Sequence, residues 1–517
     1  MPLQPRTVET RSPAPRPAEP DESDRRETAA SLGERIRRVA LGLTAALVTA
    51  RAYTTSEPNL ELGAGAGLSW VLVLLSVAGL AIAGWFLAGR LRCRWSWTDA
   101  AVVILMVLVA GSAPHALDRR PAINLAWEWI ALGVAYLLLR SLPRTWRESS
   151  ALAGALVATA VAVSAYGLYQ GAVEMPMLRA DYRRNPQQFL ARHPEVNLVP
   201  GSREHFLWEQ RFLFSNEVMS TFALGNSLAG FLVGPIVLAL AVGFQNLVRR
   251  DGDGSRWKAL GMAAPWILVM LICLMLTKSR SAWLGLLVGT GIVAWQARRA
   301  VPARVLLATG LGGLALVIVL ALAGLATGWL DREVLTQSRM SLGYRWEYWQ
   351  GTWRMITGGA SDPWTAVKSP TLWSGVGPGN FRGPYLRYKL PQSSEEILDP
   401  HNLFLEVWAT AGFWALAALV AALALGLWNL LGPPSRARAA RDAERAPPGG
   451  DRARRKSKSS APVEVVSRPD GEDKADAPPC RTLWLILSAG AGWVLVVVLG
   501  QLNLFEEGSF SRWLILG

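Results

Sequence analysis

Apolar residues in this chain gather in long, nearly continuous blocks that short polar stretches separate. A block of about 18 or more apolar residues is long enough to cross the hydrocarbon core of a bilayer as a helix. The predicted spans are 39–54, 68–89, 98–113, 121–139, 150–171, 216–247, 261–277, 281–297, 303–328, 401–431, 482–500 and a start at 509. The span 216–247 is long, so we expect it to be tilted or to begin with an interfacial turn. The pattern predicts an all-α, polytopic membrane bundle of about 11 or 12 transmembrane helices.

The polar stretches divide the chain into three regions. Residues 1–33 are rich in Pro, Arg, Glu and Ser, which predicts a disordered cytoplasmic tail. Residues 34–210 hold the N-terminal transmembrane helices and the first periplasmic loop. Residues 211–517 form the second membrane region, in which 432–481 is a low-complexity, disordered cytoplasmic insertion. The chain stops inside an apolar run, so we expect either a fragment or a last segment that is only interfacial.

Charge supports the same topology. The formal net charge is +14, but Lys and Arg cluster in the loops between alternate spans. This bias is typical of cytoplasmic loops and places the N-terminus in the cytoplasm. The basic loops are 90–97, 140–148, 248–258, 298–304 and 432–481. The distribution argues against a nucleic-acid partner, and the spacing of the three cysteines matches no zinc site.

The opposite face carries two long excursions, 172–215 and 329–400, and all four histidines. Lys278-Ser279-Arg280 joins two spans there by a very short turn. An arginine at this boundary suits an ordinary headgroup contact, because its long side chain can reach the interface. Charges fixed at a membrane boundary are nevertheless candidate functional groups.

A second candidate is an aromatic segment that carries Tyr344 and Arg345. Trp346, Trp349 and Trp353 recur at three and four residues, so they share one face of a predicted interfacial helix and would face lipid. An aromatic anchor alone explains the tryptophans. It does not explain Arg345.

A glycine-rich stretch follows, with Gly375, Gly377, Gly379 and Asn380 before Phe381. It follows no predicted strand, so it is not a dinucleotide-binding fingerprint. We expect a tight loop that brings the backbone close to a bulky group.

The last candidate segment, Asp399-Pro400-His401-Asn402, opens a long apolar span. Asp399 is the expected cap, which puts His401 at a helix N-terminus, where an anion is favoured. Asn402 and Glu406 are four residues apart and share a face.

Three further polar residues form a weaker set. They are Arg211, Glu217 and Asn226, the last of which is expected to face the bundle interior or to join helices.

In this order the motifs resemble the O-antigen ligase/polymerase family. The matching residues are Ser279-Arg280, Arg345, the Gly375–Gly379 loop with Asn380-Phe381, and His401-Asn402. The resemblance runs from about residue 211 to the end, and the insertion 432–481 and the abrupt end depart from it.

The resemblance implies a fold like that of the membrane (C-type) glycosyltransferases and a multi-pass location in the bacterial inner membrane. It implies a metal-independent transferase without cofactors that acts on the periplasmic face. The donor would be an undecaprenyl-pyrophosphate-linked glycan, and the acceptor lipid A–core or a growing glycan. By this resemblance the catalytic residues are Arg280, Arg345 and His401. The expected substrate-binding residues are Lys278, Ser279, Arg211, Tyr344, Gly377, Gly379, Asn380, Asn402 and Glu406.

The chemistry of such a reaction suits these side chains. Guanidinium groups hold phosphate oxygens in a bidentate way and stay charged. Charge develops on the departing diphosphate, so fixed arginines stabilise the transition state more than the ground state. His401 would either accept the proton of the acceptor hydroxyl or help to hold the diphosphate.

Alternatives remain at this point. A ligase and a polymerase share donor and motifs and differ only in acceptor. A transporter of lipid-linked sugars also suits many spans, although transporters often show inverted repeats and charges near the midplane. A non-catalytic scaffold explains the spans but not the ordered motifs.

Overall fold

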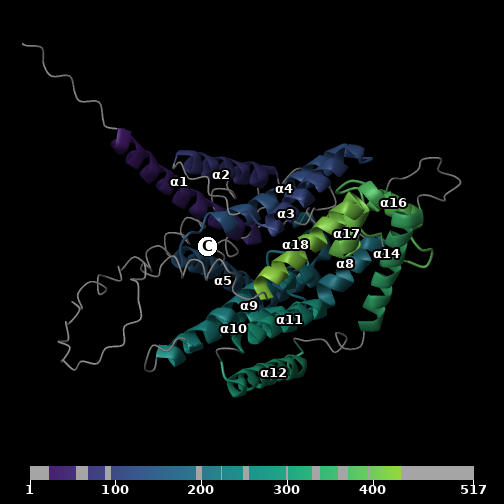
Figure 1. The fold of residues 1–517 in the computed structure, drawn as a ribbon. Helices are drawn as coiled ribbons and strands as arrows, with labels where there is room; N and C mark the ends of the chain where they lie inside the picture. Colours follow the sequence, from purple (N-terminus) through teal and green to yellow (C-terminus); the bar gives the residue numbers. More distant parts are fainter. Residues whose placement is uncertain are drawn as a thin grey trace, which may run out of the picture.

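The computed structural model describes residues 22–53, 68–87, 95–193, 201–222, 224–248, 255–298, 301–328, 338–358, 371–393 and 396–431. Every regular element within these ranges is a helix (Figure 1), so the all-α prediction is confirmed. The insertion 432–481 and the predicted spans after it lie outside the described residues. So does most of the loop 90–97.

Seven of the described helical segments are long and apolar enough to cross a membrane. They are Leu68–Leu87, Trp97–His115, Arg119–Ser141, Trp146–Arg184, Gly225–Gly243, Ala303–Ala326 and Phe413–Leu431. Each corresponds to a predicted span. The chain is therefore a polytopic helical membrane protein.

The N-terminal half is a bundle of five helices: α1 (Glu22–Ala50), α2 (Leu68–Leu87), α3 (Trp97–Ser112), α4 (Arg119–Ser141) and α5 (Trp146–Tyr169). Helix α1 begins earlier than the predicted tail boundary at residue 33. Just after that boundary, Arg37 is buried and donates to both Glu34 and Glu148 at 2.6 Å. A polar helical turn is held here by partners from α5, which its own composition does not reveal.

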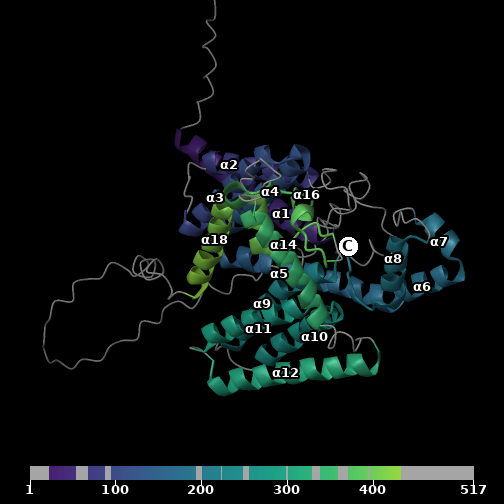
Figure 2. The same cartoon turned by 90° about the vertical axis from the view of Figure 1, so that its right-hand side faces the viewer.

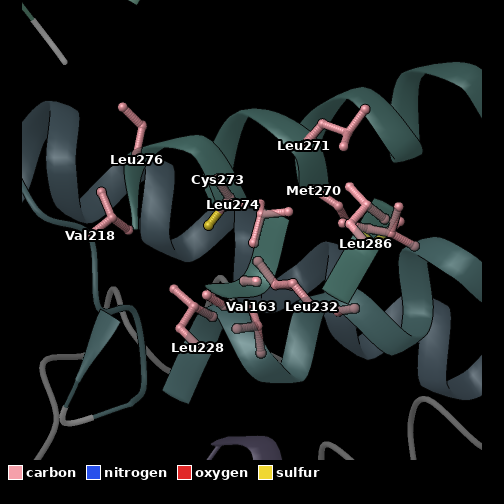
Figure 3. Packing of buried hydrophobic residues seen from close by; sticks show 14 of the residues in the cluster. Val163, Val218, Leu228, Leu232, Met270, Leu271, Cys273, Leu274, Leu276 and Leu286 are labelled. Atoms are coloured by element: carbon pink, nitrogen blue, oxygen red, sulfur yellow. The ribbon is translucent and has the colours of Figure 1, made fainter. Parts of the chain in front are cut away.

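The second half adds α9 (Gly225–Val248), α10 (Ser255–Leu276), α11 (Arg280–Ala297) and α12 (Ala303–Ala326). Helices α5, α9, α10 and α11 share one apolar core, which Figure 3 shows around Val163, Leu232, Cys273 and Leu286. Helix α12 lies at the edge of the bundle in both views (Figures 1 and 2). Residues 216–222 before α9 are not helical, which agrees with the interfacial turn expected for the span 216–247.

The first excursion is helical. A five-residue π-helical turn, Gln170–Glu174, leads from α5 into α6 (Met175–Arg184), α7 (Pro186–Arg192) and α8 (Arg203–Phe214). Figure 2 shows these three helices as an arm beside the bundle.

The remaining helices are α14 (Ser338–Gly358), α15 (Thr371–Ser374), α16 (Arg382–Tyr388), α17 (Leu403–Ala411) and α18 (Phe413–Leu431). The predicted span 401–431 is thus broken between α17 and α18. Gly412 sits at the break with φ of 86°, and a Cβ there would lie 2.0 Å from the Trp373 carbonyl oxygen. Only glycine suits this close backbone crossing.

Candidate functional site

The candidate residues lie at one end of the helix bundle. At the opposite end, Arg140 donates to Ser96 at 2.7 Å and Asn429 to Thr98 at 3.0 Å, so the ends of the predicted basic loops meet there. The α3–α4 turn, the end of α5, the α10–α11 turn and the glycine-rich loop share the other end. The predicted alternation of sides is therefore supported by contacts between distant segments.

His401 is oriented by Asp399. The Asp399 carboxylate accepts from the backbone N–H of His401 at 2.7 Å, and its Oδ1 lies 3.0 Å from Nδ1 of the same residue. An Nδ1–H that donates to this carboxylate leaves the lone pair on Nε2. Burial acts to raise the pKa of Asp399, but hydrogen bonding and charge from His401 outweigh it and lower that pKa. The pair therefore resembles a base held by an acidic partner.

The helix cap differs from the expectation. Asn402, not Asp399, caps α17, since its side chain accepts from the N–H groups of Phe404 and Leu405. His401 precedes this cap with φ of 49°, a conformation that few non-glycine residues adopt. The helix cannot extend back through such a residue. The Asp399 carboxylate therefore bonds to His401 instead of capping the helix.

Helix α14 brings Arg345 to the same segment. The rings of Tyr348 and His401 lie 6.1 Å apart, and the indole N–H of Trp349 donates to the Pro400 carbonyl at 3.1 Å. Arg345 precedes these aromatic residues by three and four positions, so it shares their face of the helix. Arg345 therefore lies on the face of α14 that packs against the segment of His401. Tyr344 precedes Arg345 on α14 and is partly exposed.

The predicted aromatic stripe is only partly a lipid-facing surface. Trp346 and Trp353 are exposed, whereas Trp349 packs against the α14–α17 core. Trp353 also meets Trp408 of α17, with ring centroids 5.5 Å apart. Contact with α17 was not visible in the helical spacing alone.

Glu406 lies one helical turn into α17 and is largely buried. Burial raises its pKa to about 7, and the nearby negative charge of Asp399 adds to this rise, while His401 opposes it. Three titratable groups thus influence one another at the start of α17. Carboxyl groups with pKa values near 7 are frequent where protons are exchanged.

The glycine-rich loop binds two parts of the fold at once. Val376 and Gly377 donate their N–H groups to the Ala409 and Thr410 carbonyls at 2.9 and 2.8 Å, which caps the end of α17. A Cβ on Gly377 would lie 2.4 Å from that of Ala116 in the α3–α4 turn. The predicted close approach of the backbone is therefore observed, but the neighbour is the small side chain of Ala116 rather than a bulky group.

Asn380 fastens this loop to the α3–α4 turn. Its side-chain amide accepts from the Asp118 N–H at 2.7 Å and donates to the Asp118 carbonyl at 2.8 Å. Gly379 lies against Pro121 in the same region. The loop thus joins the segment that carries His401 to the N-terminal bundle.

The Lys278-Ser279-Arg280 turn packs against residues 216–222. Leu276 accepts from the Val218 N–H at 3.2 Å, and the Gln170 side chain pairs with both backbone polar groups of Ser220. Ser279 is buried, whereas Arg280 is exposed at the start of α11. Its contacts therefore hold this turn against residues 216–222 and the end of α5.

Arg211 and Glu217 form an ion pair of 3.4 Å beside that turn. Asn226 is exposed, contrary to the expectation that it faces the interior, because it lies at the start of α9 rather than deep within it.

Three non-glycine residues have positive φ among the described residues: Ser220, Lys278 and His401. Each lies in a segment that carries a candidate residue. Backbone strain of this kind persists where the surroundings fix it, and it often marks functional sites. Pattern reasoning from sequence gives no access to it.

The structure also places two further side chains against His401, those of Asp399 and Tyr348. Asp399 was expected only as a cap, and Tyr348 was not singled out. The Asp-Pro-His order was the available signal for Asp399. Among the described residues, no three His, Cys, Asp or Glu side chains gather as a metal-binding group.

The fold and the site together define a polytopic helical membrane protein with cationic and imidazole groups at one end of its bundle. Residues 265–420, from α10 into α18, match the family described as O-antigen ligase. The chain therefore carries a domain of the O-antigen ligase family, and the resemblance is confirmed over this region. The match includes Arg280, Arg345 and His401 and leaves Arg211 outside. Comparisons with curated proteins and with solved structures gave no match.

Proposed function

We propose that this protein is a glycosyltransferase that moves a glycan from an undecaprenyl-pyrophosphate carrier to an acceptor hydroxyl. The observation that carries the proposal is the Asp399–His401 pair beside the helix of Arg345, within a domain of the O-antigen ligase family.

In the proposed reaction, the acceptor oxygen attacks the anomeric carbon of the donor sugar. The bond from that carbon to the phosphate oxygen breaks, and its electron pair leaves with the diphosphate. Nε2 of His401 accepts the hydroxyl proton, and Asp399 stabilises the imidazolium that results. Every atom and charge in this step is supplied by the donor, the acceptor and these side chains.

Arg345 and Arg280 would hold the departing diphosphate. Guanidinium groups fixed near its oxygens favour the charge that develops as the bond breaks. We propose Lys278, Ser279, Tyr344 and Asn402 as neighbours of the bound substrates. In this proposal no metal ion is needed, because the arginines neutralise the diphosphate.

The remaining predicted contacts have roles within the fold as well. Gly377, Gly379 and Asn380 shape the loop below α17, Glu406 adjusts the charge near His401, and Arg211 borders the Lys278 turn. We propose that they contact substrate from these positions.

We further propose that the site faces the periplasm of a bacterial inner membrane, with the N-terminus in the cytoplasm. The basic loops at the opposite end of the bundle support this orientation.

The test is transfer by purified protein in lipid, with a lipid-linked glycan donor and defined acceptors. We expect Arg280→Ala, Arg345→Ala and His401→Ala each to lower the rate by about 100-fold or more at equal protein level. Full transfer by the His401→Ala protein would contradict the proposal. Products that grow in length would indicate a polymerase, and one transfer per acceptor a ligase. Movement of the donor across the membrane without bond change would indicate a transporter.

A further inference from the structure

The short segment before α9, residues 218–221, packs on one face of α5. A Cβ on Gly167 would lie 2.8 Å from the Val218 side chain, so the segment approaches the helix backbone closely. The Ser220 hydroxyl donates to the Val163 carbonyl at 2.7 Å. Val163 and Gly167 are four residues apart and share this face. The face continues into the π-helical turn, which begins about one helical turn after Gly167.

Gln170 opens the π-helical turn, and its side chain bonds to the backbone of that segment. The side-chain oxygen accepts from the N–H groups of Ser220 at 2.8 Å and Met219 at 3.4 Å, and the side-chain nitrogen donates to the Ser220 carbonyl at 3.4 Å. Ser220 has φ of 55°, so its backbone cannot join a regular helix or strand. A carboxamide offers an acceptor and a donor together and replaces the partners that such an element would supply. Gln170 therefore fixes the path of the chain through Ser220.

The segment in turn holds the end of α10. The Val218 N–H donates to the Leu276 carbonyl at 3.2 Å, and Figure 3 shows both residues at one end of the apolar core. Leu276 ends α10, where the last carbonyl groups lack partners within the helix. Thr277 and Ser279 follow, both buried, and the Thr277 hydroxyl accepts from the Ser279 N–H at 3.4 Å. The next residue is Arg280, the first of α11.

We propose that Gln170 is a positioning residue for Arg280. It acts through residues 218–221, which bond to the end of α10 and so hold the turn from which α11 begins. π-helical turns within α-helices are frequent at functional sites. The consequence for catalysis rests on the proposed function, whereas the effect on the turn does not.

Other bonds attach the segment when the Gln170 carboxamide is removed. The Ser220 hydroxyl still donates to the α5 backbone, and the Thr221 hydroxyl donates to the Ala52 carbonyl at 2.6 Å. Both bonds are buried and involve side chains rather than the backbone groups that Gln170 pairs. A Gln170→Leu protein should therefore fold, with the backbone around Ser220 free to change its path.

The first experiment measures the turn without any glycan, by hydrogen exchange in detergent. We expect Gln170→Leu to speed exchange about tenfold or more in peptides that cover 216–222 and 277–281, because their bonded N–H groups lose fixed partners. The control is Gln296→Leu, which removes a side-chain bond to the Leu430 carbonyl near the other end of α11 and should leave both peptides unchanged. Wild-type exchange in Gln170→Leu, or a change confined to 216–222, would overturn the proposal.

The second experiment measures glycan transfer. Gln170→Leu should lower kcat about 10- to 100-fold at an unchanged donor KM. Gln170→Glu should restore most of this loss, because a carboxylate still accepts from the two N–H groups. In the Arg280→Ala background, Gln170→Leu should lower the rate by less than about twofold, because it acts only through the missing guanidinium. The full loss in that background would show a general structural role and overturn the proposal.

The two experiments separate the two ideas. Exchange that depends on Gln170 in a protein without transferase activity would leave the positioning role standing and remove the proposed function. Wild-type kcat in Gln170→Leu would overturn the link to catalysis. If Gln170→Leu does not fold, Gln170→Asn carries both measurements, because it keeps the carboxamide but ends one carbon farther from Ser220.

Discussion

At the scale of single residues, Asp399 and His401 form one hydrogen-bonded pair. One carboxylate accepts from both the backbone and the ring of the histidine, so it fixes the ring orientation and the tautomer together. Both contacts use Oδ1, which asparagine keeps, but asparagine lacks the negative charge that stabilises the imidazolium.

We therefore expect Asp399→Asn to lower kcat about 100- to 10,000-fold, as the loss of an orienting carboxylate does elsewhere. Initial rates of transfer at saturating donor measure this effect. Asp118→Asn is the matched control, because Asp118 caps α4 at the same end of the bundle and asparagine caps equally well. An Asp399→Asn enzyme with the wild-type rate would show that Asp399 does not orient the base.

Glu406 gives a prediction about pH. Its pKa rises from 4.5 to about 7 in the folded protein, so between these values the folded state keeps a proton that the unfolded chain releases. The free energy of unfolding therefore falls as the pH rises through this window, by about 3 kcal/mol in total. This decrease in the free energy of unfolding is complete above about pH 7.

Glu406→Gln should abolish this contribution, so the variant gains melting temperature relative to the wild type at pH 8 but not at pH 4.5. Melting curves in detergent at both pH values test it, with Glu396→Gln as the exposed control. If Glu406→Gln keeps the wild-type pH dependence, Glu406 is not the group responsible.

At the scale of elements, the glycine-rich loop shows which features of the structure the sequence pattern predicts and which it does not. Its composition predicted a close approach of the backbone to a bulky group, and the structure shows a close approach to a small residue. The identity of that residue, Ala116, was not predictable, because residues 116 and 377 are brought together only by the packing of α3 on α17 and α18. Spacing assigns a residue to a face of a helix, whereas the fold assigns its partner.

Gly377→Ala should destabilise the protein by about 2–4 kcal/mol, because φ of 92° is unfavourable for alanine and its Cβ would collide with Ala116. Gly383→Ala provides the control, since a Cβ at that helical position meets nothing within 4 Å. Alanine there should be neutral or slightly stabilising. Melting temperatures of the two variants measure the difference, and equal values would refute this account of the loop.

At the scale of the whole molecule, the sequence predicted the seven described spans well, because they follow from hydropathy. It did not show the arm of α6 to α8 or the break within the last described span. Both depend on contacts that form only after the helices assemble.

The proposed orientation can be measured with single cysteines in a cysteine-free background. An impermeant maleimide should label Arg119→Cys in intact spheroplasts and Arg147→Cys only after permeabilisation, since these exposed residues lie at opposite ends of the bundle. The reverse pattern would place the site in the cytoplasm and exclude a periplasmic acceptor.

The break at Gly412 also bears on how the thickness of the bilayer affects the candidate site. Both α17 and α18 pack on α3; α18 is also bonded to α3 near the far surface, and α17 is also held by the glycine-rich loop and by Trp353. A thinner or thicker bilayer changes the tilt of a spanning helix. When α18 tilts, the chain can bend at Gly412, so that α17 and His401 keep their positions. Turnover in vesicles should therefore vary less than about twofold across lipids of different acyl-chain length, provided that the bend is present. A proline-stiffened or alanine-substituted junction would make the same reaction sensitive to the thickness of its membrane.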